Sequence, residues 1–213
     1  MAHNLPTTTL ERIEDAALSC FARYGYHASS MRTIASEAEV QPATMYHWFA
    51  NKEALVAALM RRFLEGLTRE VVAAIADKSS PVERLAAAVW AHVVYHGTHR
   101  KAAFVTDTEV RALTGEQLEE VMRLRDGYQH IFLQLVRDGQ EAGVFQARDA
   151  RIATFAILLE CTGVAVWFRP TGELTLPQVA DIHVELVLNS LNAGRSAAPA
   201  RRNAGRPTPT QAA

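Results

Sequence analysis

The sequence predicts an all-α fold, in which an N-terminal three-helix domain with a helix-turn-helix precedes a C-terminal helical bundle. Two observations carry this prediction. Every long segment repeats its apolar residues at helical spacing, and residues that cap helices stand at the starts of these segments. We find no alternating strand pattern and no strand-turn-helix phosphate loop, which argues against β and nucleotide-binding α/β folds.

The first helix is expected to begin at Thr8 or Thr9 and to end at Gly25, after Tyr24. Its apolar residues fall on one face and predict the first wall of a small core: Leu10, Ile13, Ala17, Leu18 and Phe21.

The stretch from residue 30 to residue 49 predicts two short helices joined by a tight turn. Ser29 and Ser30 can cap the first helix, in which Ile34, Ala35 and their neighbours share a face. Val40 can fill the junction, and Pro42 suits the first position of the second helix because it lacks an N–H. This arrangement is typical of a helix that reads the DNA major groove, although such helix pairs also occur as plain structural corners.

The next helix begins with Asn51 as its cap, and Glu53 complements the helix dipole. Lys52 therefore lies beside the second short helix, where a cation and free N–H groups suit a phosphate oxygen. The residues expected to face DNA are Ser30, Arg32, Thr33, Gln41, Pro42, Ala43, Thr44, Tyr46, His47 and Lys52.

Several short motifs in this region resemble the N-terminal domain of TetR/AcrR-type regulators. They are Phe21 to Tyr26, Met31 to Ala35, Val40, Tyr46, Phe49, Lys52, Glu53 and Leu55. The resemblance implies a DNA-binding domain at residues 7–67 and a body at residues 80–193 for dimerisation and ligand binding. It also implies a dimeric repressor that a small molecule releases from a palindromic operator.

The chain departs from the pattern of this family at two positions. Glu39 holds a turn position that is usually glycine, so we expect either a strained turn or a slightly different one. Trp48 stands where the family usually has His or Tyr, just before Phe49. These departures leave base preference unreadable from the sequence.

The chain of 213 residues has only two cysteines, Cys20 and Cys161, each in an apolar helical context. Two buried free thiols and the lack of a signal pattern predict a cytoplasmic location. The longest apolar run, residues 152–168, contains Glu160 at its centre, so we expect a buried helix and no membrane partner.

The net charge of −1 is unevenly distributed. The tail after Gly194 carries +4 in four arginines, so residues 1–193 carry −5. Because non-specific DNA affinity comes from phosphate neutralisation, DNA binding must rest on a few local contacts. The tail at residues 194–213 is expected to be disordered, with an electrostatic role in DNA association left open.

Four long helices are expected in the body. They begin after Ser80, after Thr114, after Asp149 and at Pro177, and the third runs from residue 151 to residue 168. The last two are apolar on more than one face, which predicts a homodimer, with a closed monomeric core as the alternative.

The segment from Trp167 to Thr175 resembles TetR-type repressors of fatty-acid or steroid breakdown that respond to acyl-CoA thioesters. That resemblance implies an apolar tunnel for the acyl part and arginines for the phosphates. The candidate ligand-binding residues are Trp90, His96, Phe104, Arg123, Arg125, Phe132, Phe155, Trp167 and Arg169.

Two other function classes stay open at this point. His92, His96 and His99 lie at i, i+4 and i+7, so they share a helix face that could hold a metal in an all-α enzyme. No nucleophile elbow or Cys-His signature supports an enzyme, and we expect no cofactor. A helical adaptor would explain the apolar faces but not the capped short helix pair.

Overall fold

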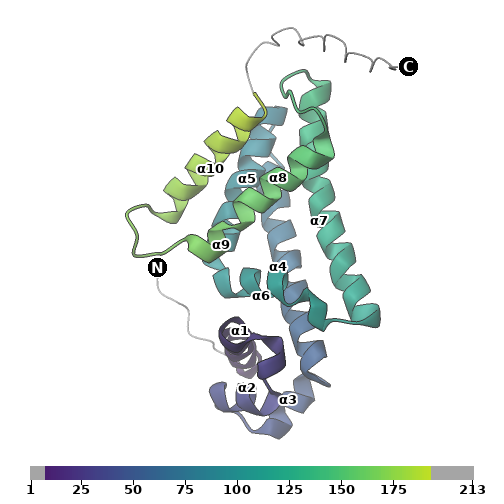
Figure 1. Ribbon diagram of the computed structural model, residues 1–213, viewed down its shortest axis with the longest axis vertical. Coiled ribbons are helices and arrows are strands. Elements are labelled where there is room, and N and C mark those ends of the chain that lie inside the picture. Colours follow the sequence, from purple (N-terminus) through teal and green to yellow (C-terminus); the bar gives the residue numbers. More distant parts are fainter. Residues whose placement is uncertain (1–7, 193–213) are drawn as a thin grey trace, which may run out of the picture.

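In residues 8–192, which the computed structural model describes, the chain forms helices and no strand (Figure 1). The predicted tail, 194–213, lies outside the described residues. The helices are α1 (Thr9–Ala28), α2 (Met31–Glu37), α3 (Pro42–Trp48), α4 (Lys52–Ile75), α5 (Pro81–Thr98), α6 (Arg100–Thr108), the 3₁₀ turn η1 (Val110–Ala112), α7 (Gly115–Glu141), α8 (Ala150–Thr162), α9 (Val164–Trp167) and α10 (Leu176–Ser190).

Helices α1 to α3 and the start of α4 form a small head at one end of the molecule (Figure 1). The predicted caps are confirmed: the side chains of Thr8, Ser30 and Asn51 each accept a backbone N–H at a helix start. The core that these helices enclose is fully buried and includes Ile13, Phe21, Ile34, Met45 and Leu55.

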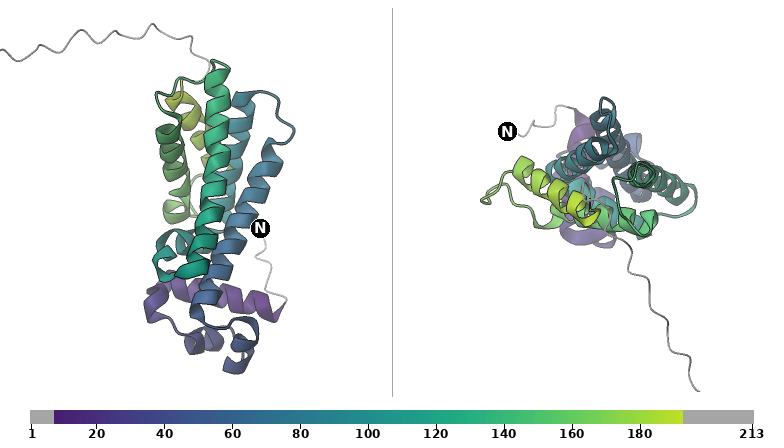
Figure 2. Two further views of the ribbon diagram at one scale, coloured as in Figure 1. Left: turned by 90° about the vertical axis from the view of Figure 1, so that its right-hand side faces the viewer. Right: turned by 90° about the horizontal axis from the view of Figure 1, so that it is seen from above.

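Helix α4 runs from the head into the body without interruption (Figure 2). The boundary that we expected at residue 67 therefore coincides with no break in the backbone. In the body α4 packs against α5 and α7, while α10 packs on α5 and α8 packs on α7. Helix α6 lies between the body and the head and contacts α1 (Figure 1). The head is thus joined to the body through α4 and α6.

The helices differ from prediction in two places, a break at Gly163 and the additional helix α6. The helix expected from residue 151 to residue 168 breaks at Gly163, where α8 ends and the short α9 begins. The predicted end of the first helix at Gly25 is confirmed as a break: Gly25 has a non-helical φ of 78° and ψ of 166°, and a further short helical turn then reaches Ala28. Helix α6 has no capping side chain at its start, since its N-cap is His99 and forms no such bond, and the sequence analysis missed it.

The stretch 150–167 is long and apolar enough to cross a membrane by length and composition alone. Our expectation that this run forms a buried helix is wrong for the single chain, since only 28% of it is buried. The thiols of Cys20 and Cys161 are both free and buried, as predicted. Burial raises the pKa of Cys161 to about 12, which leaves this thiol uncharged and unreactive.

Candidate DNA-reading face and effector cavity

Helix α3 presents a polar outer face at the far end of the head (Figure 1). Met45 is fully buried and anchors the helix, and this orientation turns Gln41, Ala43, Tyr46 and His47 outward. Pro42 is also exposed, and Thr44 is half-buried. Tyr46 is 59% exposed and forms no hydrogen bond within the described part of the chain. Its phenol is therefore available to a partner.

Ser30 and Thr33, two of the residues expected to face DNA, form the hydrogen bonds that cap the start of α2. The hydroxyl of Ser30 accepts the backbone N–H of Thr33 at 3.0 Å, and the two hydroxyl oxygens lie 2.7 Å apart. Arg32 follows on the exposed side of the same helix. Helices α2 and α3 pack against each other at the end of the head (Figure 1). Arg32 and Thr33 are both exposed.

The turn between α2 and α3 is held from outside by Arg12. Glu39 has a φ of 53°, so the turn keeps the left-handed conformation that glycine usually supplies. The guanidinium of Arg12 donates to the carbonyl oxygens of Ala38 at 2.6 Å and Glu39 at 2.9 Å. These charge-assisted bonds help to offset the strain. The sequence analysis missed Arg12, because its partners are backbone groups 26 and 27 residues away.

Lys52 forms internal contacts that the sequence did not indicate. Its ammonium donates to the carbonyl oxygens of Tyr26 and Ser29, each at 2.7 Å, and lies over the Tyr26 ring. Partial burial lowers the pKa of Lys52. Two of its three donors are therefore engaged within the head, and one is left for the phosphate that we expected there.

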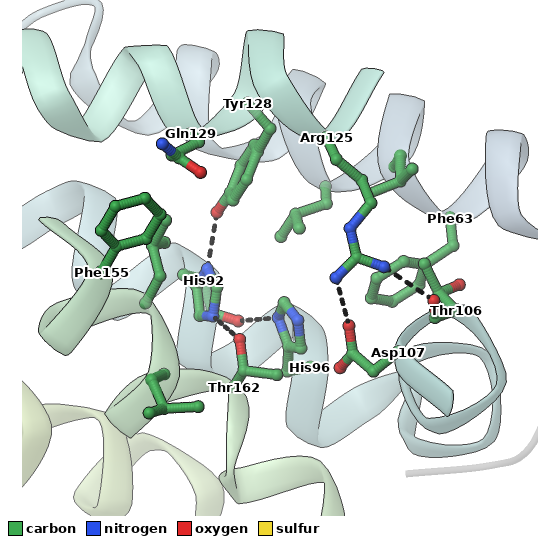
Figure 3. Close-up of a pocket in the computed structure, with 14 residues that line it drawn as sticks. Phe63, His92, His96, Thr106, Asp107, Arg125, Tyr128, Gln129, Phe155 and Thr162 are labelled. Carbon is green, nitrogen blue, oxygen red and sulfur yellow. Dashed lines mark hydrogen bonds and ion pairs between the residues drawn. The ribbon is translucent and has the colours of Figure 1, made fainter. Parts of the chain in front are cut away.

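The body contains a cavity of about 450 Å³ between α4, α5, α6, α7 and α8 (Figure 3). One part of its wall is apolar and the other is polar, as in many ligand sites. The lining residues are Phe63, Leu64, Leu67, His92, His96, Thr106, Asp107, Arg125, Tyr128, Gln129, Phe155, Leu158, Leu159 and Thr162.

A buried hydrogen-bonded group forms one section of the polar wall (Figure 3). His92 Nδ1 lies 2.6 Å from the Tyr128 hydroxyl, and His92 Nε2 lies 3.2 Å from the Thr162 hydroxyl. The His96 ring stacks on the His92 ring with centroids 4.0 Å apart, and its Nδ1 lies 3.0 Å from the His92 carbonyl oxygen. Burial keeps both histidines neutral, since it lowers the pKa of His92 well below its usual value and that of His96 to about 4.

An ion pair forms another section of the polar wall (Figure 3). Arg125 on α7 donates to the carbonyl oxygen of Thr106 at 2.9 Å and to the Asp107 carboxylate at 3.3 Å. Burial raises the pKa of Asp107, while the neighbouring guanidinium lowers it. Arg125 thereby ties the cavity wall to the end of α6.

The residues predicted to bind the ligand do not all line one cavity in the structure. His96, Arg125 and Phe155 line the cavity, and Phe132 is buried behind it, with its ring centroid 5.8 Å from that of His92. Trp90 lines a different groove, between α4 and α5.

The remaining candidates do not line the cavity. The Trp167 ring stacks near His183. Arg169 donates to the carbonyl oxygens at the end of α9. The side chain of Arg123 is 70% exposed. Phe104, which we also expected at the ligand, is absent from the lining.

Several lining residues were not predicted. Tyr128 and Thr162 lie at positions where helical periodicity indicates only burial, and Asp107 lies on the helix that the sequence analysis missed. Phe63 and Leu67 of α4 also line the cavity, and their helical spacing likewise indicates only burial. These residues differ from ordinary core residues only because five helices meet around a cavity at this place. The spacing of residues along the sequence does not show how helices meet.

The alternative of a metal held by three histidines is wrong for the described residues. His99 is exposed, and its Nδ1 lies 3.0 Å from the Tyr95 carbonyl oxygen. Its ring stacks on the Tyr95 ring, away from the stacked pair of His92 and His96. No cluster of three His, Cys, Asp or Glu side chains that could hold a metal occurs in residues 8–192.

Polar contacts connect the cavity walls to the head. The Glu53 carboxylate, in the first turn of α4, accepts the backbone N–H of Thr114 at 2.7 Å and its hydroxyl at 2.9 Å. On α6, Lys101 donates to the Ser19 hydroxyl of α1 at 2.8 Å. A displacement of α4, α6 or the start of α7 would therefore change the position of the helices of the head through these contacts.

Comparison with known proteins gives two family matches. The family described as bacterial regulatory proteins, tetR family, matches residues 13–59, and the tetracyclin repressor-like C-terminal domain matches residues 78–191. The second match alone spans more than half of the chain.

Known relatives and a solved structure agree with these matches. The transcriptional repressor KstR2 of Rhodococcus jostii is 29% identical over 83% of this chain and 88% of its own length. The fatty acid metabolism regulator protein of Bacillus subtilis is 26% identical over 85% of this chain and 94% of its own. The structure of AibR with isovaleryl coenzyme A and operator DNA superposes with a TM-score of 0.77 at 24% identity, covering 87% of this chain and all of AibR.

These matches favour a regulator over a bundle enzyme or a helical adaptor. The head contains a helix-turn-helix whose second helix is exposed, the body contains a cavity, and the two family matches together cover both parts. The chain belongs to the TetR family and is a DNA-binding transcriptional regulator.

Proposed function

We propose that the protein is a homodimeric repressor that holds a palindromic operator and leaves it when an acyl-CoA thioester enters the cavity. The observation that carries this proposal is the position of the cavity. Its walls include α4 and α6, the two helices that also contact α1 of the head. A ligand that favours another arrangement of these walls will change the population of heads that fit the operator.

An apolar face without a partner supports the dimer. Helices α8 to α10 lie on the side of the body that faces the viewer in Figure 1, and this side is at the left in the first view of Figure 2. Leu159 on this side is 79% exposed, which is costly for a leucine unless a partner covers it. The other exposed apolar residues of these helices are Ile152, Phe155, Val166, Trp167, Ile182 and Leu186.

A second copy of the chain suits this face because a two-fold arrangement pairs a surface with itself. Phe155 and Leu159 belong both to this face and to the cavity lining. In the proposed dimer the partner subunit therefore covers the mouth of the cavity. Two copies of α3 would then meet half-sites about one duplex turn, or a small multiple of it, apart.

The chemistry of the cavity supports an acyl group. Phe63, Leu64, Leu67 and Leu158 supply an apolar wall, and Arg125 places a cation on the polar side. The named role of the B. subtilis relative is fatty acid metabolism, and AibR has been crystallised with isovaleryl coenzyme A. We assign the acyl chain to the apolar wall. We assign the thioester end to the side of Arg125, with the exposed Arg123 and Arg169 as candidates for the phosphates.

A mobility-shift assay tests the proposal. Purified protein is added to DNA fragments from around its own gene at low salt, and acyl-CoA thioesters of increasing chain length are then titrated in. We expect a shifted band that at least one thioester abolishes, while free coenzyme A leaves it in place. A shifted band that no thioester affects would leave the regulator in place and overturn the effector class. The dimer is tested by sedimentation of the wild type and of Leu159→Glu, which we expect to be a folded monomer.

A further inference from the structure

The polar wall around His92 holds more hydrogen-bonding capacity than the protein itself uses. His92 is 2% exposed, His96 3% and Tyr128 6%, so bulk water has little access to form hydrogen bonds with their polar atoms. Buried donors and acceptors without partners are costly, and a ligand that pairs with them gains in affinity and in specificity.

One O–H donor in this group has no acceptor. A neutral imidazole carries one N–H, so His92 can donate through one ring nitrogen only. If Tyr128 donates to Nδ1, then Nε2 donates to Thr162 and the Thr162 hydrogen is left over. If Thr162 donates to Nε2, then Nδ1 donates to Tyr128 and the phenol hydrogen is left over. Both arrangements leave one hydroxyl hydrogen, and both hydroxyls line the cavity.

One acceptor in the same group has no donor. The partner of His96 Nδ1 is a carbonyl oxygen, which only accepts, so Nδ1 carries the hydrogen and Nε2 carries a lone pair. Nothing in residues 8–192 donates to this lone pair. Among the described residues, Gln117 Oε1 is the one side-chain oxygen or nitrogen that is both fully enclosed and unpaired. His96 Nε2 is unpaired as well, so it is not fully enclosed and keeps access to the cavity that His96 lines.

A free donor and a free acceptor around one imidazole match a group that can accept and donate at once. A hydroxyl does both, whereas a ketone only accepts and a hydrocarbon does neither. Both histidines are held neutral by burial, so this wall offers no cation to a carboxylate. Arg125, the cation of the cavity, is already assigned to the thioester end.

We propose that the effector carries a hydroxyl group on its acyl chain, which donates to His96 Nε2 and accepts from the unpaired hydroxyl of Tyr128 or Thr162. This inference rests on the acyl thioester proposed above and narrows it. A saturated acyl chain would leave both wall groups unpaired, and this makes it the weaker ligand.

The test compares ligands that differ only in the hydroxyl. Octanoyl-CoA, 3-hydroxyoctanoyl-CoA and 8-hydroxyoctanoyl-CoA are titrated calorimetrically into the full-length protein. We expect at least one hydroxylated thioester to bind about tenfold more tightly than octanoyl-CoA, as for a site whose polar groups are built for a hydroxyl. If both hydroxylated ligands bind no better than octanoyl-CoA, the inference is wrong while the proposed function stands. If no thioester binds at all, the proposed effector class fails, and the inference fails with it.

Variants then locate the hydroxyl. Thr162→Val and Tyr128→Phe remove one hydroxyl each with little change in shape. The preference is the ratio of the two dissociation constants measured on the same variant. We expect it to fall to within about twofold in the variant that lacks the hydroxyl that meets the ligand, and in the double variant. Thr154→Val is the matched control: Thr154 is a fully buried threonine of the same helix, and its hydroxyl donates to the Ala150 carbonyl outside the cavity. A preference that survives in both Thr162→Val and Tyr128→Phe, or that is lost equally in Thr154→Val, would overturn the assignment.

Discussion

The ammonium of Lys52 lies 4.1 Å from the centre of the Tyr26 ring and donates to the carbonyl oxygen of the same residue at 2.7 Å. A second bond of equal length reaches the carbonyl oxygen of Ser29. The end of α1 and the start of α4 are therefore joined by a single side chain. A residue that the sequence suggests for phosphate contact also holds together the head that presents α3.

Removal of this ammonium should loosen the head. We expect Lys52→Met to lower the free energy of unfolding by about 1–2 kcal/mol, the range for charged hydrogen bonds that are partly open to solvent. Urea denaturation followed by circular dichroism measures the change. Lys78→Met is the control, because Lys78 pairs only with its exposed neighbour Asp77. Equal midpoints for the two variants would show that the contacts of Lys52 contribute nothing to stability.

The phenol of Tyr46 should matter for DNA and not for folding. Because Tyr46 is more than half exposed and has no partner in the described chain, Tyr46→Ala should change the unfolding free energy by less than about 0.5 kcal/mol. Operator affinity should fall by about tenfold or more, as expected for loss of a specific groove contact.

The salt dependence of binding tests what Tyr46 touches. If it contacts a base edge, the slope of log affinity against log salt should be unchanged in Tyr46→Ala. Fluorescence anisotropy at several salt concentrations gives both numbers. An affinity equal to that of the wild type would remove Tyr46 from the reading face.

Stability should fall in mild acid because of the buried histidine pair. The folded-state pKa of His96 is about 4, well below its usual value of 6.5, so between these values the unfolded chain binds a proton that the folded chain does not. Stability is therefore fully present above pH 6.5 and is lost as the pH falls towards 4. His96 alone should cost about 2 kcal/mol between pH 7 and pH 5. His92 acts in the same direction.

The contribution of His96 is isolated by difference. Glu14 and Asp107, whose pKa values are raised by burial, act in the opposite direction, so the total profile of one protein is not diagnostic. Thermal unfolding of the wild type and of His96→Gln at pH 5 and pH 7 gives the difference. We expect the variant to lose less stability on acidification than the wild type does. His99→Gln, at an exposed site, should behave as the wild type, and parallel profiles for all three proteins would contradict the prediction.

The sequence predicted the head better than the cavity, and the reason is physical. Capping by Ser30 or Asn51 and the burial of Ile34 depend on residues within one or two turns, so local spacing reveals them. The support of Glu39 by Arg12 depends on contacts across the head and leaves no local signal.

The cavity depends on contacts across still longer stretches of the chain. Tyr128, His92 and Thr162 come from three helices and meet only after α5, α7 and α8 have packed. An aromatic residue at helical spacing looks the same whether it faces a core or a cavity. For this reason Trp90 was expected at the ligand but lines another groove.

Two glycines of α7 allow a direct test of this packing. A Cβ added at Gly139 would overlap the ring of Phe145, whereas a Cβ at Gly127 would meet nothing within 4 Å. Both lie in α7, Gly127 near its middle and Gly139 in its last turn, so changing glycine to alanine favours the helix at both positions. Gly127→Ala should therefore raise the unfolding free energy by about 0.5–1 kcal/mol. Gly139→Ala should lower it by about 1–3 kcal/mol, because the ring of Phe145 has to move within a closed core. Chemical denaturation of the two variants gives these values, and a stabilised Gly139→Ala would show that α7 and the loop after it are not packed as described.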